Sequence, residues 1–61
     1  MKRNDFIKIL TKNNVIFFRH GSKHDVYMHN VTGKKVTVPR HGEVDNKLAN
    51  KILVELFPNR N

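Results

Sequence analysis

Two stretches of helical periodicity, one near each end of the chain, enclose three short stretches that have the composition of β-strands. Apolar residues recur at helical spacing over residues 5–12, so we expect a helix there with Asn4 as its N-cap. They recur again over residues 43–57, and Pro58 blocks continuation of the helix. Each helix must bury its apolar stripe against another element. This order predicts one α+β domain over residues 1–61, with both helices on one face of a sheet.

The three strands are predicted over residues 15–18, 24–29 and 35–39, where β-branched and aromatic residues gather. The connections between them are short, and Gly33 lies in the second one, so neighbouring strands should pair antiparallel. Alternation along the last two strands predicts a core face made of Val26, Met28, Val36 and Val38. The same alternation predicts an open face that carries Asp25, Tyr27, His29, Lys35 and Thr37.

The net charge of +7 is large for 61 residues, and the basic side chains are spread along the chain rather than confined to one tail. This favours a polyanion partner, with nucleic acid first, an anionic membrane surface second and an acidic protein third. A basic surface could also simply keep a small domain soluble. The chain has no cysteine, which excludes a disulfide framework and a thiolate metal site. No segment approaches membrane-spanning length, so we expect a soluble cytoplasmic protein.

Residues 21–24 are predicted to form a tight turn that carries a histidine into the second strand. We expect Gly21 to take the positive φ that a reversal needs and Ser22 to bond the local backbone. His24 follows as the first residue of the strand, where its imidazole can give or take a proton near neutral pH. Alternation places His24 on the face of Val26, but a side chain at the strand mouth can leave by the end of the sheet. His24 is therefore the candidate acid or base.

If the polyanion partner is RNA, its cleavage without a metal would need a group that takes the proton of the 2′-hydroxyl, a group that protonates the leaving 5′-oxygen, and cations around the phosphate. His24 can fill either proton role. The cations that could hold the phosphate are Lys23, Lys35 and Arg40. Tyr27, or whichever of Phe17 and Phe18 points to the open face, could stack an unpaired base. The candidates for a second proton-transfer group are His20, His29 and His41.

The pattern predicts neither a metal nor a cofactor. His20 and His24 are four residues apart, a spacing that places two side chains on one side of a helix. Here, however, a Gly-Ser turn lies between them and no cysteine completes a ligand set. The sequence also lacks a glycine-rich phosphate loop before a helix and a legible Ser-His-Asp arrangement.

Two segments carry a resemblance to a known family. They are residues 21–27 (Gly-Ser-Lys-His-Asp-Val-Tyr) and residues 36–41 (Val-Thr-Val-Pro-Arg-His). With a helix on either side of them, the chain resembles the HicA family of bacterial toxins, also called YcfA-like mRNA interferases, over residues 5–56. Many relatives carry a histidine directly after the turn serine, whereas here Lys23 stands there and His24 follows, as in a second common variant of the family.

The resemblance implies both a fold and an activity. The fold would be the double-stranded-RNA-binding-like arrangement of order α-β-β-β-α, with a three-stranded antiparallel sheet. The activity would be metal-independent endoribonucleolytic cleavage of mRNA in unpaired segments, with His24 as the histidine that cleavage needs. A HicB-like antitoxin would hold the toxin inactive. The alternative is a non-catalytic RNA-binding module that uses only the fold and the basic surface.

Overall fold

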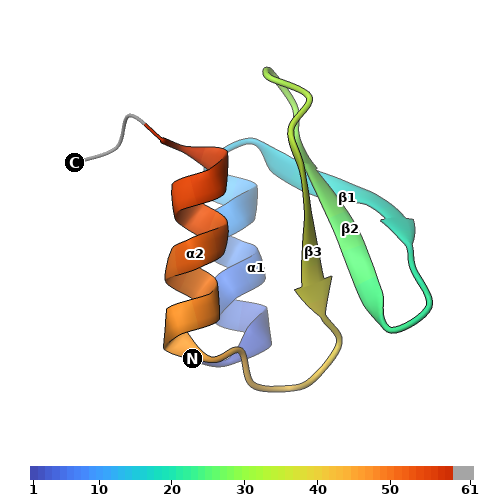
Figure 1. The fold of residues 1–61 in the computed structure, drawn as a ribbon, viewed down its shortest axis with the longest axis vertical. Coiled ribbons are helices and arrows are strands. Elements are labelled where there is room, and N and C mark those ends of the chain that lie inside the picture. The colour runs from blue at the N-terminus through green and yellow to red at the C-terminus, as the bar shows by residue number, and fades with distance from the viewer. Residues whose placement is uncertain (59–61) are drawn as a thin grey trace.

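The computed structural model describes residues 1–58, and within them the predicted order of elements is confirmed (Figure 1). The elements are α1 (Arg3–Lys12), β1 (Val15–His20), β2 (His24–His29), β3 (Lys35–Pro39) and α2 (Asn46–Leu56). The strands form one antiparallel sheet in the order β1-β2-β3. Both helices pack on the same face of this sheet (Figure 1). The α+β fold that the sequence predicts is therefore the fold of the protein.

Helix α1 begins at Arg3, earlier than the sequence predicts, and Asn4 lies inside the helix rather than at its N-cap. The N-cap position belongs to Lys2, whose side chain makes no capping hydrogen bond. Contacts from a distant part of the chain hold this end instead. Lys2 forms an isolated β-bridge with Glu43, and the backbone N–H of Arg3 donates to the carbonyl of Gly42 at 2.9 Å. A tertiary contact thus replaces the local cap that the sequence suggests.

The core lies between the helices and one face of the sheet. Its buried members are Phe6, Leu10, Val15, Tyr27, Val36, Val38, Val44, Ala49, Ile52 and Leu56. Val36 and Val38 face the helices, as predicted for β3. For β2 the predicted facing is wrong, because Tyr27 pairs directly with Val36 and directly paired residues share a face. The helix-facing side chains of β2 are Asp25, Tyr27 and His29.

The reversed facing of β2 has a physical reason. The ring of Tyr27 is only 8% exposed and buries more apolar surface beneath the helices than the smaller Val26 could. The imidazole of His29 packs edge-on against Phe57, with ring centroids 5.4 Å apart. Asp25 can be buried because its charge is paired with cations. Val26 therefore points to the open face, away from both helices.

Strand β1 is longer than predicted and contains a β-bulge between Phe17 and Arg19. Before the bulge, Phe17 pairs with Tyr27 on the helix side of the sheet. After it, Arg19 lies opposite a residue of the open face, and His20 pairs with Asp25 on the helix side. The extra residue shifts the alternation of side chains by one position. The bulge thus brings His20 to the same face as Asp25.

Candidate functional site

The turn between β1 and β2 is closed by a close approach of two backbone segments. The N–H of Gly21 donates to the carbonyl of His24 at 2.7 Å. Gly21 is not among the residues with positive φ, so the predicted reason for this glycine is wrong. A Cβ at this position would lie 2.9 Å from the His24 carbonyl oxygen, closer than real Cβ atoms approach. Glycine is required here because any side chain would force the turn apart.

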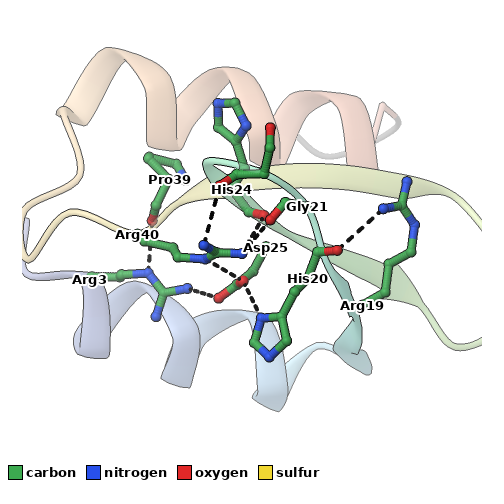
Figure 2. A network of polar contacts seen from close by, with 9 residues as sticks. Arg3, Arg19, His20, Gly21, His24, Asp25, Pro39 and Arg40 are labelled. Atoms are coloured by element: carbon green, nitrogen blue, oxygen red, sulfur yellow. Dashed lines mark hydrogen bonds and ion pairs between the residues drawn. The ribbon is translucent and has the colours of Figure 1, made fainter.

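Asp25 is the centre of a polar network that ties four parts of the chain together (Figure 2). Its side chain is only 11% exposed. Arg3 of α1 donates from Nη2 to Oδ2 at 2.9 Å, and Arg40 donates from Nε to Oδ1 at 2.9 Å. His20 Nδ1 lies 2.8 Å from Oδ1. The hydrogen bond from His20 and then that from Arg40 lower the pKa of Asp25 to about 2.

The negative charge of Asp25 decides which ring nitrogen of His20 carries the shared proton. The ionised Asp25 carboxylate can only accept hydrogen bonds, so Nδ1 of His20 must carry the proton that it donates. The imidazole is otherwise 74% exposed. His20 is therefore held in one orientation and one tautomer. In its neutral form the opposite ring nitrogen, Nε2, is the hydrogen-bond acceptor.

Arg40 fastens the turn to the sheet. Besides Asp25, its guanidinium donates to backbone carbonyls on both sides of the turn, which belong to Gly21, Ser22 and His24. The sequence predicts a phosphate-binding role for Arg40. In the structure its side chain orders the segment from which His24 projects.

His24 is exposed at the first position of β2, opposite Pro39. Alternation places it on the face of Val26, as predicted, but this face is the open one, so His24 is not buried. Its ring points away from that of His20 (Figure 2). The structure therefore separates the two histidines, because His20 lies on the helix side of the sheet and His24 on the open face.

The remaining predicted site residues fall into three environments. Lys23 is exposed in the turn, beside His24. Lys35 is exposed on the open face, where its Nζ lies 5.0 Å from the centroid of the Phe18 ring. Tyr27 lies in the core, so the prediction that it stands on the open face is wrong. The sequence reasoning missed the contact between His20 and Asp25, because only the bulge in β1 places these side chains together.

The pH dependence of stability should reveal the Asp25 network. The pKa of Asp25 is lower in the folded chain than its ordinary value of 3.8, so its ion pairs stabilise the fold above about pH 4 and are lost as the pH falls towards 2. Urea unfolding of the native protein and of an Asp25→Asn variant would measure this. We expect the native protein to be the more stable at pH 5 and its advantage to shrink between pH 4 and pH 2. A constant difference across that range would contradict the proposed pairing.

Within residues 1–58, no helix combines the length and the hydropathy needed to cross a membrane. A family model described as the HicA toxin of bacterial toxin-antitoxin systems matches residues 3–56. No curated protein and no solved structure matches the chain significantly. The matched range includes all five helices and strands, the β1–β2 turn and every residue of the Asp25 network.

Proposed function

Because this chain belongs to the HicA toxin family of bacterial toxin-antitoxin systems, we propose that it is a metal-independent endoribonuclease that cleaves mRNA. The observation that carries the proposal is the position of His24. It is the residue that matches the family's histidine after the Gly-Ser turn, and it is exposed at the end of a strand whose turn is fixed by Arg40. A side chain that is reachable and yet attached to an ordered backbone suits proton transfer.

The proposed chemistry is an internal transfer at one phosphodiester. The imidazole of His24 takes the proton of the ribose 2′-hydroxyl, and the 2′-oxygen attacks the adjacent phosphorus. The bond from phosphorus to the 5′-oxygen breaks, which leaves a 2′,3′-cyclic phosphate on one product. A proton delivered from water, or returned by the histidinium, completes the 5′-hydroxyl of the other product. Because one histidine performs the proton transfers, turnover should be slow.

The cations around His24 have distinct proposed roles. Lys23 is the nearest in sequence and is free to contact the phosphate from the turn. Lys35 stands on the same face of the sheet as His24 and would hold a phosphate further along the strand of RNA. Arg40 positions the turn, since its guanidinium bonds Asp25 and the turn carbonyls. Tyr27 is not proposed as a stacking residue, because it is buried.

We also propose an acidic, HicB-like antitoxin as the protein partner. The turn bearing His24 and Lys23 is exposed, so an inhibitor that covers it with carboxylates would block the phosphate site and the histidine at once. RNA and antitoxin would then compete for one surface. An mRNA target places the toxin in the cytoplasm.

Incubation of the purified protein with end-labelled mRNA in the presence of EDTA tests the proposal. We expect discrete shorter products whose new 3′ ends carry a cyclic phosphate or its hydrolysis product. Retarded but intact RNA would instead identify the alternative, a non-catalytic RNA-binding module. Binding without cleavage would be explained by the net charge of +7, because electrostatic binding of RNA needs no catalytic group and weakens steeply with salt.

A further inference from the structure

The face of the sheet opposite the helices carries a mixture of apolar and basic side chains. In the register of the strands, Ile16, Met28 and Lys35 form one row across it. The next row is made of Arg19, Val26 and Thr37. Phe18 is the extra residue of the bulge between these rows, and His24 lies at the end of the face. No helix of residues 1–58 covers this surface (Figure 1).

Phe18 and Lys35 contact each other across the open face. They belong to the two outer strands, and the Lys35 ammonium stands 5.0 Å from the centre of the Phe18 ring. Val26 belongs to the strand between theirs and is only 7% exposed, although both helices are on the other side of the sheet. Its cover must come from its neighbours on the open face. Phe18, still 46% exposed, is a neighbour of Val26 at the bulge and presents an aromatic ring with a cation over it.

Phe17, the preceding residue, has the same exposure of 46% but a different setting. Its ring meets the ring of Tyr27 edge-on, with centroids 5.8 Å apart and an interplanar angle of 81°. The centroid of its ring also lies 4.9 Å from that of the His20 ring. Phe17 thus belongs to the helix side of the sheet, and Phe18 is the phenylalanine of this pair that faces the same way as His24.

The distance across the sheet from Phe18 to His24 is comparable to the span of one extended nucleotide of RNA. The bulge lies beside Val26, and His24 precedes Val26 by two residues on the same strand. Two residues of β-strand span about 7 Å and neighbouring strands lie about 4.8 Å apart, so the backbone positions of Phe18 on β1 and His24 on β2 are about 8–9 Å apart. One extended nucleotide can cover such a distance. A base above Phe18 would then leave the neighbouring phosphate near the imidazole.

We propose that Phe18 is the platform on which an unpaired base of the RNA substrate stacks, and that this base sets the position of the cut next to it. The proposal rests on the nuclease function given above. In the free protein the Lys35 ammonium lies over the Phe18 ring, on the side where a base would stack. Because the lysine side chain is flexible, the ammonium can move from the ring to a phosphate when a base binds there. The bases of an A-form duplex are already stacked within the helix, so only an unpaired segment can use this site.

A tryptophan probe tests the stacking directly, because the chain contains no tryptophan of its own. The variants Phe18→Trp and Phe17→Trp form a matched pair of adjacent, equally exposed positions on opposite faces. Titration with a short single-stranded RNA in EDTA should quench the indole fluorescence strongly in Phe18→Trp and weakly in Phe17→Trp. A duplex of the same sequence should quench neither. Equal quenching at both positions would overturn the proposal.

Binding and cleavage of the leucine variants complete the test. We expect Phe18→Leu to weaken binding of the single strand roughly 5- to 150-fold, the range found when alanine replaces an aromatic residue that stacks one base. The cleavage positions should also become less well defined. Phe17→Leu should remain within about 2-fold of the native affinity, and circular dichroism should show both variants folded. If Phe18→Leu fails to fold, the fluorescence titration still decides the matter.

The outcomes separate this inference from the nuclease function. Quenching that is specific to Phe18→Trp, without any RNA product, would leave the stacking site standing and remove the nuclease. If Phe18→Leu cleaved RNA at the native rate and positions, the nuclease function would stand and the stacking site would be wrong. If Phe18→Leu lost affinity for an acidic antitoxin but not for RNA, the open face would be a protein-binding surface and the proposal would be wrong.

Discussion

Replacing His24 with alanine is expected to abolish RNA cleavage and growth arrest while leaving the fold intact. Loss of a general acid or base typically lowers a rate by about 10²- to 10⁴-fold, which for a slow enzyme means no detectable product. The fold should persist because the side chain is exposed and because the bond that closes the turn uses the backbone carbonyl of residue 24. Cleavage of labelled RNA and circular dichroism of the same preparation would measure both effects.

His20→Ala is the matched control for this experiment. His20 is also an exposed histidine beside the same turn, but its ring lies on the other side of the sheet, where Asp25 holds it. We expect His20→Ala to keep its cleavage activity. If His20→Ala were inactive and His24→Ala active, the reactive imidazole would be the one that Asp25 orients. An unfolded His24→Ala protein would show instead that residue 24 supports the core.

Replacing Tyr27 with alanine is expected to unfold most of the protein. Removal of a buried aromatic ring costs about 3–5 kcal/mol. A chain of this length has a total stability of only a few kcal/mol, because it buries a modest fraction of its surface. Urea unfolding followed by circular dichroism should therefore show a broad loss of native signal for Tyr27→Ala even without denaturant.

Met28→Ala provides the comparison, since Met28 lies next to Tyr27 on β2 but points to the open face and is only partly buried. It should remain folded with a modest loss of stability. The facing of β2 deduced from alternation alone predicts the opposite ranking. A stable Tyr27→Ala protein that had lost only RNA binding would indicate that Tyr27 lies on the open face, as alternation predicts, and would contradict the packing described above.

Features of this protein that depend on neighbouring residues could be predicted from the sequence. The order of the five elements, the bounds of β2 and β3, and the inward facing of Val36 and Val38 follow from hydrophobic period and turn composition. The exposure of His24 was also predicted, although for a different reason. The structure exposes it because its whole face of the sheet is open, not because its side chain leaves by the end of the strand.

The buried face of β2 and the groups around Asp25 depend on how the elements pack together. In β2 both alternating sets contain apolar residues, Val26 and Met28 on one side and Tyr27 on the other, so local alternation cannot choose between them. The pairing with β3 makes the choice, because Tyr27 opposite Val36 gives the larger buried surface under the helices. The register depends on two paired strands, so it cannot be predicted from the sequence of one strand alone.

The bulge in β1 had a similar effect on the candidate site. It shifted the alternation after Phe18, which set His20 beside Asp25, whereas Phe18 would lie on the face of His24 even without the bulge. Arg3 and Arg40 reached the same carboxylate from positions 22 and 15 residues away. Contacts between such distant residues form only when the whole chain has folded, because the entropy of closing those loops is offset by the packing of the core. The sequence therefore determined the elements, and their packing decided which side chains meet.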